Sequence, residues 1–411
     1  MRKMELLAPA GNMEKLRMAL RYGADAVYLA GQSFGLRAFG GNFSDGELRE
    51  AVEFTHSQGK KVYITVNIIP RNSDLERLEP YIKYIRDIGA DAVIISDLGI
   101  FSAVREWCPD LNIHVSTQAS TSNWRTARAW KNMGASRVVL ARELSLDEIQ
   151  EIHDKAEMET EVFIHGAMCI SWSGRCLLSN YFTEGQRDSN RGECIQACRF
   201  RYTVMEESRP GQYWPIAEDE NGTYLFNSKD LCLLDYLPEL QHAGVSSLKI
   251  EGRMKSVYYA AAVVSVYRRA LDAFYAEGSC FHIRPEWRAE LESVSHRPYT
   301  TGFAFGRPGG EGQEYSRSQP VQTYDFVARV LSYDRNRHYL WVEQRNRFAV
   351  GETLECLCPD GTVYSLFIQE MKDQEGLFIT AAPHPLQHVA LRCEEELPED
   401  TILRRKNSHV K

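Results

Sequence analysis

The chain has 411 residues, which is enough for one large domain and a smaller one. Its hydrophobic fraction of 44% and charged fraction of 25% are ordinary for a globular protein, and no apolar run approaches the roughly 20 residues that cross a bilayer. The formal net charge of −8 excludes binding of nucleic acid through overall charge, so an RNA would need a local basic patch. The N-terminal sequence does not read as a secretory signal. We therefore expect a cytoplasmic protein with reduced cysteines and no membrane association.

A helix-to-strand junction recurs in the N-terminal part of the chain. It reads YGADAVYLA (22–30), IGADAVIIS (88–96), MGASRVVLA (133–141) and AGVSSLKIE (243–251). In each copy a glycine ends an amphipathic helix, and the short apolar run after it is typical of a strand buried on both faces. Four more strands of this type are predicted at 5–11, 61–67, 113–118 and 161–166.

Helical segments separate these predicted strands, and such alternation indicates a parallel sheet. Eight units predict an α/β fold with a closed (β/α)8 barrel of the TIM type. An open doubly wound sheet is the alternative, although the first strand lacks the glycine-rich fingerprint of its dinucleotide-binding form. We assign residues 1–295 to the barrel domain, including a long predicted helix at 256–275.

The regular spacing breaks after the seventh strand. Residues 166–245 form an insertion before the last barrel strand, and five of the ten cysteines fall within it. They are Cys169, Cys176, Cys194, Cys198 and Cys232. Because barrel enzymes build their sites from loops at the C-terminal ends of strands, we expect these cysteines to lie over the barrel mouth.

The C-terminal part has a different pattern. A linker rich in glycine and polar residues is predicted at 296–320, and residues 321–411 contain short alternating segments with turn signals between them. Strands are predicted at 326–333, 338–344, 352–358, 362–369 and 388–394. They indicate a small C-terminal antiparallel β-barrel domain.

The clustered cysteines indicate a metal site. Four thiolates can hold an iron–sulfur cubane or a structural zinc ion. Zinc ribbons usually supply C-x2-C pairs, and the wide spacing here favours the larger iron–sulfur cluster over zinc. The remaining cysteines are predicted to be packing residues: Cys108, Cys280, Cys356, Cys358 and Cys393.

Polar residues at predicted strand ends are further candidates, because such positions bind ligands or catalyse in barrels. They are Asn67, Asp97, His114, Gln118, Arg142, His165, Glu251 and Arg253. A histidine within a strand is more often a core residue than a base, so His114 is a weak candidate and His165, beside the cysteine loop, a stronger one.

Arginines flank the cysteines, and their guanidinium groups can bind carboxylates or phosphates bidentately. They include Arg175, Arg187, Arg191, Arg199 and Arg201. The competing interpretation is that they pair with the neighbouring acids Glu184, Asp188 and Glu193.

The common motifs of hydrolases and NTPases are missing: there is no H-E-x-x-H, G-x-S-x-G or Walker loop. A cysteine peptidase stays formally open because His165 precedes Cys169 by four residues.

Several long motifs are familiar. HGAMCISWSGRCLLSNY, RDSNRGECIQACRFRY, DENGTYLFNSKDL and SLKIEGRMKSVYY resemble the collagenase-like peptidase family of unclassified catalytic type, and most closely its branch that takes part in tRNA hydroxylation. The opening LLAPAGNMEKLRMALRYGADAVYLAG and the later NRFAVGETLECLCPDG match the same branch, so the resemblance covers nearly the whole chain.

The resemblance implies more than a peptidase. Several members belong to oxygen-independent hydroxylation systems in which four cysteines hold a [4Fe-4S] cluster, and this branch implies 5-hydroxylation of the wobble uridine of tRNA with prephenate as co-substrate. The implied ligands are Cys169, Cys176, Cys194 and Cys232, with Cys198 open as an alternative to Cys194.

We assign the remaining candidates to three roles. Catalytic roles are predicted for His165, Arg175 and Asp97, and binding of the co-substrate for Arg142, Arg253 and Gln118. Binding of tRNA is predicted for Arg187, Arg191, Lys249 and Lys255. The alternatives are a peptidase, as the family name suggests, and a zinc-stabilised RNA-binding or maturation factor. A partner protein or homo-oligomer is left open.

Overall fold

The computed structural model describes residues 2–36, 41–169, 171–199, 217–219, 222–224, 228–314 and 320–407. The chain divides into two compact units. The first comprises Met1–Leu16, Ala24–Lys255 and Arg297–Pro320, and the second Arg17–Gly23, Ser256–His296 and Val321–Lys411.

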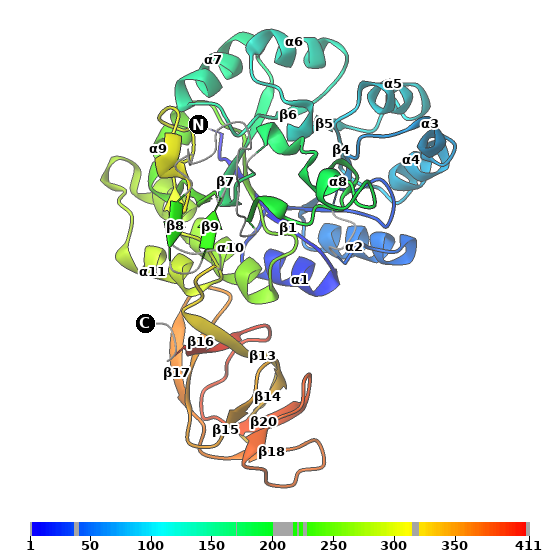
Figure 1. Ribbon diagram of the computed structural model, residues 1–411. Coiled ribbons are helices and arrows are strands. Elements are labelled where there is room, and N and C mark those ends of the chain that lie inside the picture. The colour runs from blue at the N-terminus through cyan, green and yellow to red at the C-terminus, as the bar shows by residue number, and fades with distance from the viewer. Residues whose placement is uncertain are drawn as a thin grey trace. The chain divides into compact units, whose positions relative to one another are not determined.

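Parallel strands close into a barrel in the first unit (Figure 1). They are β1 (Glu5–Pro9), β2 (Ala26–Leu29), β3 (Lys61–Val66), β4 (Ala92–Ile95), β5 (Ile113–Val115), β6 (Arg137–Val139), β7 (Glu159–Ala167) and β11 (Ser247–Ile250). Each pairs with the next, and β11 completes the ring by pairing with both β7 and β1. This closure confirms the predicted (β/α)8 barrel and excludes the open sheet.

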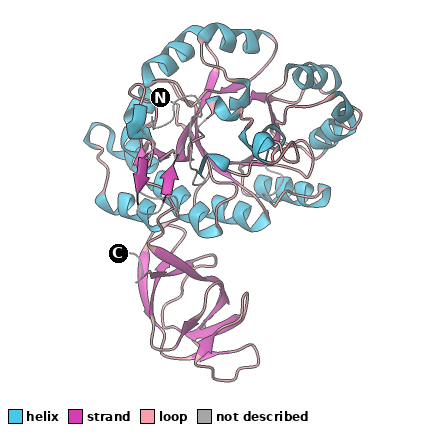
Figure 2. Ribbon diagram, in the orientation of Figure 1, coloured by secondary structure: helices cyan, strands magenta, loops and turns pink. Residues whose placement is uncertain are grey.

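Helices lie outside the strand ring, as Figure 2 shows. They are α2 (Asp45–Ser57), α3 (Asn72–Leu75), α4 (Leu78–Asp87), α5 (Leu98–Trp107), α6 (Trp124–Asn132), α7 (Leu146–Ala156) and α9 (Leu237–His242), after α1 (Met13–Arg21). Ser44 and Ser145 begin α2 and α7 with capping boxes. Gly89, at φ +84°, follows α4 and lets the chain turn into β4. In the described part of the chain no helix is long and apolar enough to span a membrane.

The described part of the insertion between β7 and β11 contains mostly short elements. They are the 3₁₀ turns η2 (Trp172–Gly174), η3 (Ser189–Arg191), η4 (Ala197–Arg199) and η5 (Leu234–Tyr236), helix α8 (Leu178–Phe182), and strands β8 (Ala217–Asp219), β9 (Gly222–Tyr224) and β10 (Asp230–Cys232). Strand β10 pairs antiparallel with the end of β7, and β12 (Tyr299–Thr300) pairs with β10.

Charged side chains fill part of the barrel interior. The Arg137 guanidinium lies 2.6 Å from Glu5 and 3.2 Å from Glu161, and Lys249 lies 2.6 Å from Glu161. Tyr63 donates a hydrogen bond of 2.7 Å to Glu5. Burial acts to raise the pKa of Glu5, but the charge and hydrogen bond of Arg137 outweigh it and hold this pKa below its usual value. The interior is therefore a paired ionic network.

The second unit contains helices α10 (Val257–Glu277) and α11 (Pro285–Ser293) and an antiparallel sheet that forms a half-barrel. In sheet order its strands are β17 (Val363–Phe367), β16 (Thr353–Leu357), β21 (Ile402–Lys406), β13 (Tyr324–Asp334), β14 (Tyr339–Gln344), β20 (His388–Arg392) and β18 (Met371–Lys372). Strands β15 (Phe348–Ala349) and β19 (Ala381–Ala382) form a separate pair. All five strands predicted here are present, whereas β21 was not predicted.

Arg404 on β21 explains why α10 and α11 group with this sheet. Its guanidinium contacts the carboxylate of Glu290 on α11 and donates a hydrogen bond of 2.9 Å to the Tyr258 hydroxyl on α10. These side chains are buried or nearly so, and the contacts join residues far apart in sequence.

The cysteines outside the insertion behave as predicted with one exception. Cys108, Cys356, Cys358 and Cys393 are buried core residues. Cys280 is exposed at the end of a 3₁₀ turn, so the prediction that it packs in the core is wrong.

Candidate functional site: a cysteine-lined cavity

A cavity of about 470 Å³ lies where the C-terminal ends of several barrel strands meet the insertion. Gln118 after β5, Arg142 after β6 and Glu251 after β11 contribute strand-end side chains to it. The rest of the wall comes mainly from the insertion. In barrels this end of the strands is where loops assemble binding sites.

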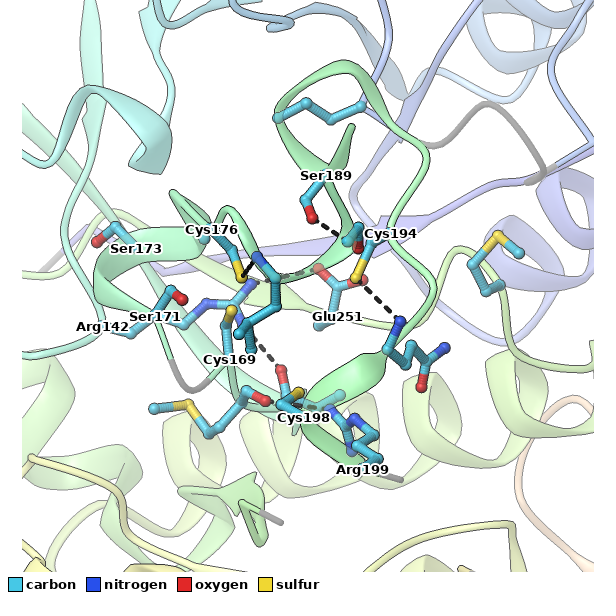
Figure 3. A pocket seen from close by; sticks show the side chains of 18 of the residues that line it. Arg142, Cys169, Ser171, Ser173, Cys176, Ser189, Cys194, Cys198, Arg199 and Glu251 are labelled. Atoms are coloured by element: carbon cyan, nitrogen blue, oxygen red, sulfur yellow. Dashed lines mark hydrogen bonds and ion pairs between the residues drawn. The ribbon is translucent and has the colours of Figure 1, made fainter. Parts of the chain in front are cut away.

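Four of the five clustered cysteines line this cavity: Cys169, Cys176, Cys194 and Cys198. Figure 3 shows them around the ion pair of Arg142 and Glu251. Cys232 lies on β10 opposite His165 and is not among the lining residues. Within the described ranges, no group of three His, Cys, Asp or Glu side chains converges closely enough to hold a single metal ion.

Hydrogen bonds from neighbouring residues hold the thiol-bearing segments in place. Asn190 brackets Cys176: its side chain accepts from the Cys176 N–H at 3.3 Å and donates to the Cys176 carbonyl at 3.1 Å. The backbone N–H groups of Leu178 and Gln196 donate to the sulfurs of Cys176 and Cys194, each at 3.4 Å. Such N–H···S contacts stabilise thiolates, the form in which cysteine binds metals.

The protonation of two thiols follows from their surroundings. Enclosure by protein raises the pKa of Cys169 and of Cys198, because burial disfavours the charged form, and the neighbouring thiols act in the same direction. Solvent still reaches Cys169 through the cavity. Metal binding at these sulfurs would therefore release protons. By donor chemistry and N–H···S contacts the residues present fit a thiolate-bound cluster.

Two carboxylates outside the insertion anchor it. Asp74 receives both terminal nitrogens of Arg191, at 2.8 and 3.0 Å, in a bidentate ion pair. Glu143, just beyond β6, accepts hydrogen bonds from the Ser173 N–H at 2.6 Å and the Ser173 hydroxyl at 2.9 Å. The two contacts hold the segments on either side of Cys176.

We expect Asp74→Asn to loosen the insertion in a pH-dependent way. The hydrogen bonds from Arg191 lower the pKa of Asp74 to about 2, so the pair stabilises the folded state above the ordinary aspartate pKa, and this contribution is lost as pH falls toward about 2. At neutral pH the variant should lose about 1–2 kcal/mol of unfolding free energy, a difference that shrinks between about pH 4 and pH 2. Urea unfolding of both proteins over this range measures it.

The exposed pair of Lys83 and Glu79 provides the control, because its loss in Glu79→Gln should cost less than about 0.5 kcal/mol. A wild-type–variant difference that stayed constant with pH would show that Asp74 stabilises the protein by another route.

Arg142 and Glu251 form the floor of the cavity. The Arg142 guanidinium lies 3.3 Å from the Glu251 carboxylate and donates a hydrogen bond of 2.7 Å to the Ala167 carbonyl. It also lies over the Phe163 ring, 3.7 Å from the ring centroid. A Cβ added at Gly166 would come within 2.4 Å of the Glu251 carbonyl oxygen, and Gly166 has a φ of +106°. Glycine is required here because β7 and the chain after β11 approach so closely.

A second, smaller cavity of about 60 Å³ has Arg142, Glu251 and Gln118 in its wall as well. Arg253 also lines it and donates to the Asn42 side chain at 3.1 Å and the Thr65 hydroxyl at 3.5 Å. The Gln118 side-chain oxygen accepts from Asn67 at 3.3 Å. The three residues predicted to bind the co-substrate thus gather at the barrel mouth, but each is already engaged with protein groups.

The predicted catalytic residues lie apart from one another. His165 is 1% exposed, packs against the Tyr299 ring and does not line the cavity. Asp97 accepts a hydrogen bond of 3.0 Å from the Ile100 N–H and so caps α5. Arg175 is exposed and donates to the Gln118 carbonyl at 2.8 Å. His165 and Asp97 thus make structural contacts outside the cavity lining, and the catalytic roles of all three residues stay predictions.

The residues predicted to bind RNA lie in different environments and do not form one surface. The structure corrects the prediction for Lys249, which is 5% exposed inside the barrel, paired with Glu161, and cannot reach an RNA. Arg191 is held by Asp74, and not by the nearby acids considered in the sequence. Arg187 is partly exposed within the insertion, and Lys255 lines the cavity.

His114 is a buried core residue, and burial lowers its pKa well below the usual value.

Sequence reasoning missed Glu143, Asp74 and Arg297. Glu143 follows strand β6 and could have been found by the strand-end rule that selected Arg142. Asp74 pairs with Arg191 of the insertion, and Arg297 lines the cavity that holds the cysteines. Both lie far along the chain from the cysteine motifs, and no local sequence pattern connects them to these motifs.

The fold and the site together define a (β/α)8-barrel protein with a cysteine-lined cavity at its mouth. The chain belongs to peptidase family U32: the profile of that family matches residues 11–314, and the profile of the U32 C-terminal domain matches residues 322–404. This confirms the resemblance found in the sequence.

Three relatives illustrate the family. The chain is 42% identical to tRNA hydroxylation protein P1 of Bacillus subtilis, covering 98% of this chain and 95% of that protein. It is 36% identical to tRNA hydroxylation protein P of Escherichia coli, covering 98% and 97%. It is 35% identical to the 23S rRNA 5-hydroxycytidine C2501 synthase of Escherichia coli, covering 75% of this chain and 46% of that protein.

Proposed function

We propose that this protein is an RNA-modifying enzyme that hydroxylates tRNA, with the wobble uridine as its target and prephenate as its co-substrate. Two similar proteins over nearly their full lengths are named for tRNA hydroxylation, and a third is named for hydroxylation of a cytidine in rRNA. RNA hydroxylation is what these names share. The uridine, its position and the co-substrate come from the resemblance of the sequence motifs.

The observation that carries the proposal is the set of four thiols on one cavity at the barrel mouth. We propose that Cys169, Cys176 and Cys194 hold a [4Fe-4S] cluster and that Cys198 is the fourth ligand. The proposal departs from the motif-based set at one position, because Cys198 lines the cavity whereas Cys232 does not. When bound, such a cluster would supply redox chemistry at this cavity.

The chain's own residues have defined tasks in this proposal. Asn190 and Glu143 fix the segments that carry the thiols, and the backbone N–H groups of Leu178 and Gln196 donate hydrogen bonds to the sulfurs of Cys176 and Cys194. Arg142 and Glu251 close the bottom of the cavity toward the barrel. A uridine would enter from the open side after leaving its stack, which costs a few kcal/mol that RNA contacts must offset.

A peptidase mechanism has less support. Covalent hydrolysis needs a nucleophile with a base within hydrogen-bond reach. No histidine is among the described residues that line the cavity, and of its carboxylates Glu251 is paired with Arg142 and Glu143 is bonded to Ser173.

Deleting the gene is expected to remove 5-hydroxyuridine and the modifications derived from it from the wobble position of tRNA, provided that no paralogue remains. Nucleoside mass spectrometry measures this, with the wild-type gene restoring the signal and Cys176→Ser failing to restore it. Unchanged levels in a strain without any paralogue would contradict the proposed function.

A further inference from the structure

Three cations from separate parts of the chain share one wall of the large cavity. Arg199 lies in η4 beside Cys198 (Figure 3), Lys255 follows β11, and Arg297 precedes β12. Their proximity is evident in their electrostatics. Burial lowers the pKa of Lys255; the charge of Asp230 opposes this, and the charges of Arg297 and Arg199 add to it. Burial and the charge of Arg199 likewise lower the pKa of Arg297, against the charge of Asp230.

Among the described residues, the carboxylates near this wall are fewer than its cations. Asp230 is 1% exposed; it accepts the Arg297 backbone N–H at 3.1 Å, and its other oxygen lies 3.8 Å from the Arg297 guanidinium. Glu251 is paired with Arg142 at the floor of the cavity. Gathering like charges in a partly buried wall costs free energy, and an anion bound between them would offset that cost.

Arg199 adds an independent geometric sign. One terminal nitrogen, Nη2, donates to the Met168 carbonyl at 3.2 Å. The other, Nη1, is shielded from solvent and has no hydrogen-bond acceptor among the described residues. A buried guanidinium N–H normally has an acceptor, and a ligand oxygen in the cavity would supply one.

We propose that Arg199, Lys255 and Arg297 form the binding site for a carboxylate group of a small organic anion, next to the cysteine cluster. Guanidinium groups bind carboxylate and phosphate oxygens alike, so which anion binds depends on which can reach these residues. Arg297 is only 8% exposed and Lys255 is partly buried, which places the site below the rim of the cavity. A small molecule can reach such a wall, whereas a phosphate of a folded RNA would meet exposed cations such as Arg175 first.

This inference rests on the proposed function, which names prephenate as the co-substrate. Prephenate is a dicarboxylate, so it serves as the probe for the site. The three residues differ from those predicted to bind the co-substrate, namely Arg142, Arg253 and Gln118, and Lys255 takes this role in place of the tRNA contact predicted for it. The site would hold the anion within the same cavity as the four thiols.

Prephenate binding to anaerobically purified full-length protein tests the inference. By isothermal titration calorimetry, Lys255→Gln and Arg297→Gln should each weaken prephenate binding by about tenfold or more, since each removes one charge-assisted contact. The conservative variants Lys255→Arg and Arg297→Lys should recover most of the affinity. Lys83→Gln, which removes an exposed cation of α4 outside the cavity lining, should change it by less than about twofold.

Three further readouts make the result decisive. Iron content and thermal unfolding of each variant identify losses that come from a damaged fold, and the conservative variants then carry the comparison. Binding of tRNA should be unchanged in Lys255→Gln and Arg297→Gln. Weaker tRNA binding with a smaller salt slope and intact prephenate binding would overturn the inference in favour of an RNA phosphate. Unchanged binding of both ligands would overturn it as well. Prephenate binding is measured without any hydroxylation. A failure of this inference can therefore be told apart from a failure of the proposed function, which would appear as unchanged wobble modification in a deletion strain.

Discussion

Replacing Cys169, Cys176 or Cys194 with serine is expected to abolish the iron and sulfide content of anaerobically purified protein and, with it, tRNA hydroxylation. These thiols line one cavity, and cysteine binds a cluster as the thiolate, whereas a serine hydroxyl stays protonated at neutral pH. Wild-type protein should contain about four irons and about four sulfides per chain and absorb visible light. Iron and acid-labile sulfide analysis measures the loss.

Cys108→Ala is the matched control, because Cys108 is a fully buried core residue away from the cavity and its variant should keep its iron. The fourth ligand is tested by comparing Cys198→Ser with Cys232→Ser. The cavity predicts that iron is lost from the first variant and kept in the second. The opposite result would return the fourth position to Cys232, as the motif resemblance implies.

Arg137→Met is expected to cause a large loss of stability. Arg137 is 3% exposed and pairs with Glu5, Glu159 and Glu161 inside the barrel. Removing one partner of a buried ion pair leaves a buried charge without compensation and typically costs about 3–5 kcal/mol. Urea unfolding followed by circular dichroism, analysed for the barrel transition, measures this change.

Lys83→Met is the control for charge removal, since Lys83 and Glu79 are about half exposed and such pairs contribute less than about 1 kcal/mol. A loss of less than about 1 kcal/mol in Arg137→Met would mean that the barrel interior repacks around a neutral side chain, as some buried ion pairs allow.

Much of the fold was predictable because its signals are local. Each barrel strand is a short apolar run, and glycines such as Gly89 and Gly134 end helices at positive φ directly before the next strand. A period that repeats along the chain predicts a barrel without knowledge of any long-range contact. The strand β21 escaped prediction because its sequence, ILRRK, is too basic to read as a buried strand, although Arg404 within it is paired with Glu290.

The chemistry of the site was predictable, but which residues lie together in it was not. Cysteine spacing indicated a cluster, yet it could not choose between Cys194 and Cys198, and it did not show that Cys232 lies outside the cavity lining, which depends on how the insertion folds back. Lys249 lies in a predicted buried strand, and a charge there must be paired. That rule could have shown that it faces the barrel interior, but its partner Glu161 lies 88 residues away in sequence.

Oxygen transfer by purified protein tests the account most directly. Anaerobically prepared protein would be incubated with prephenate and tRNA from the deletion strain, and the nucleosides analysed by mass spectrometry together with a peptide-cleavage assay. The account predicts that the wobble uridine gains the mass of one oxygen atom, that Cys176→Ser abolishes this gain, and that no peptide is cleaved. Iron-loaded protein that leaves the tRNA unchanged but hydrolyses peptides, with the same rate in Cys176→Ser, would contradict it.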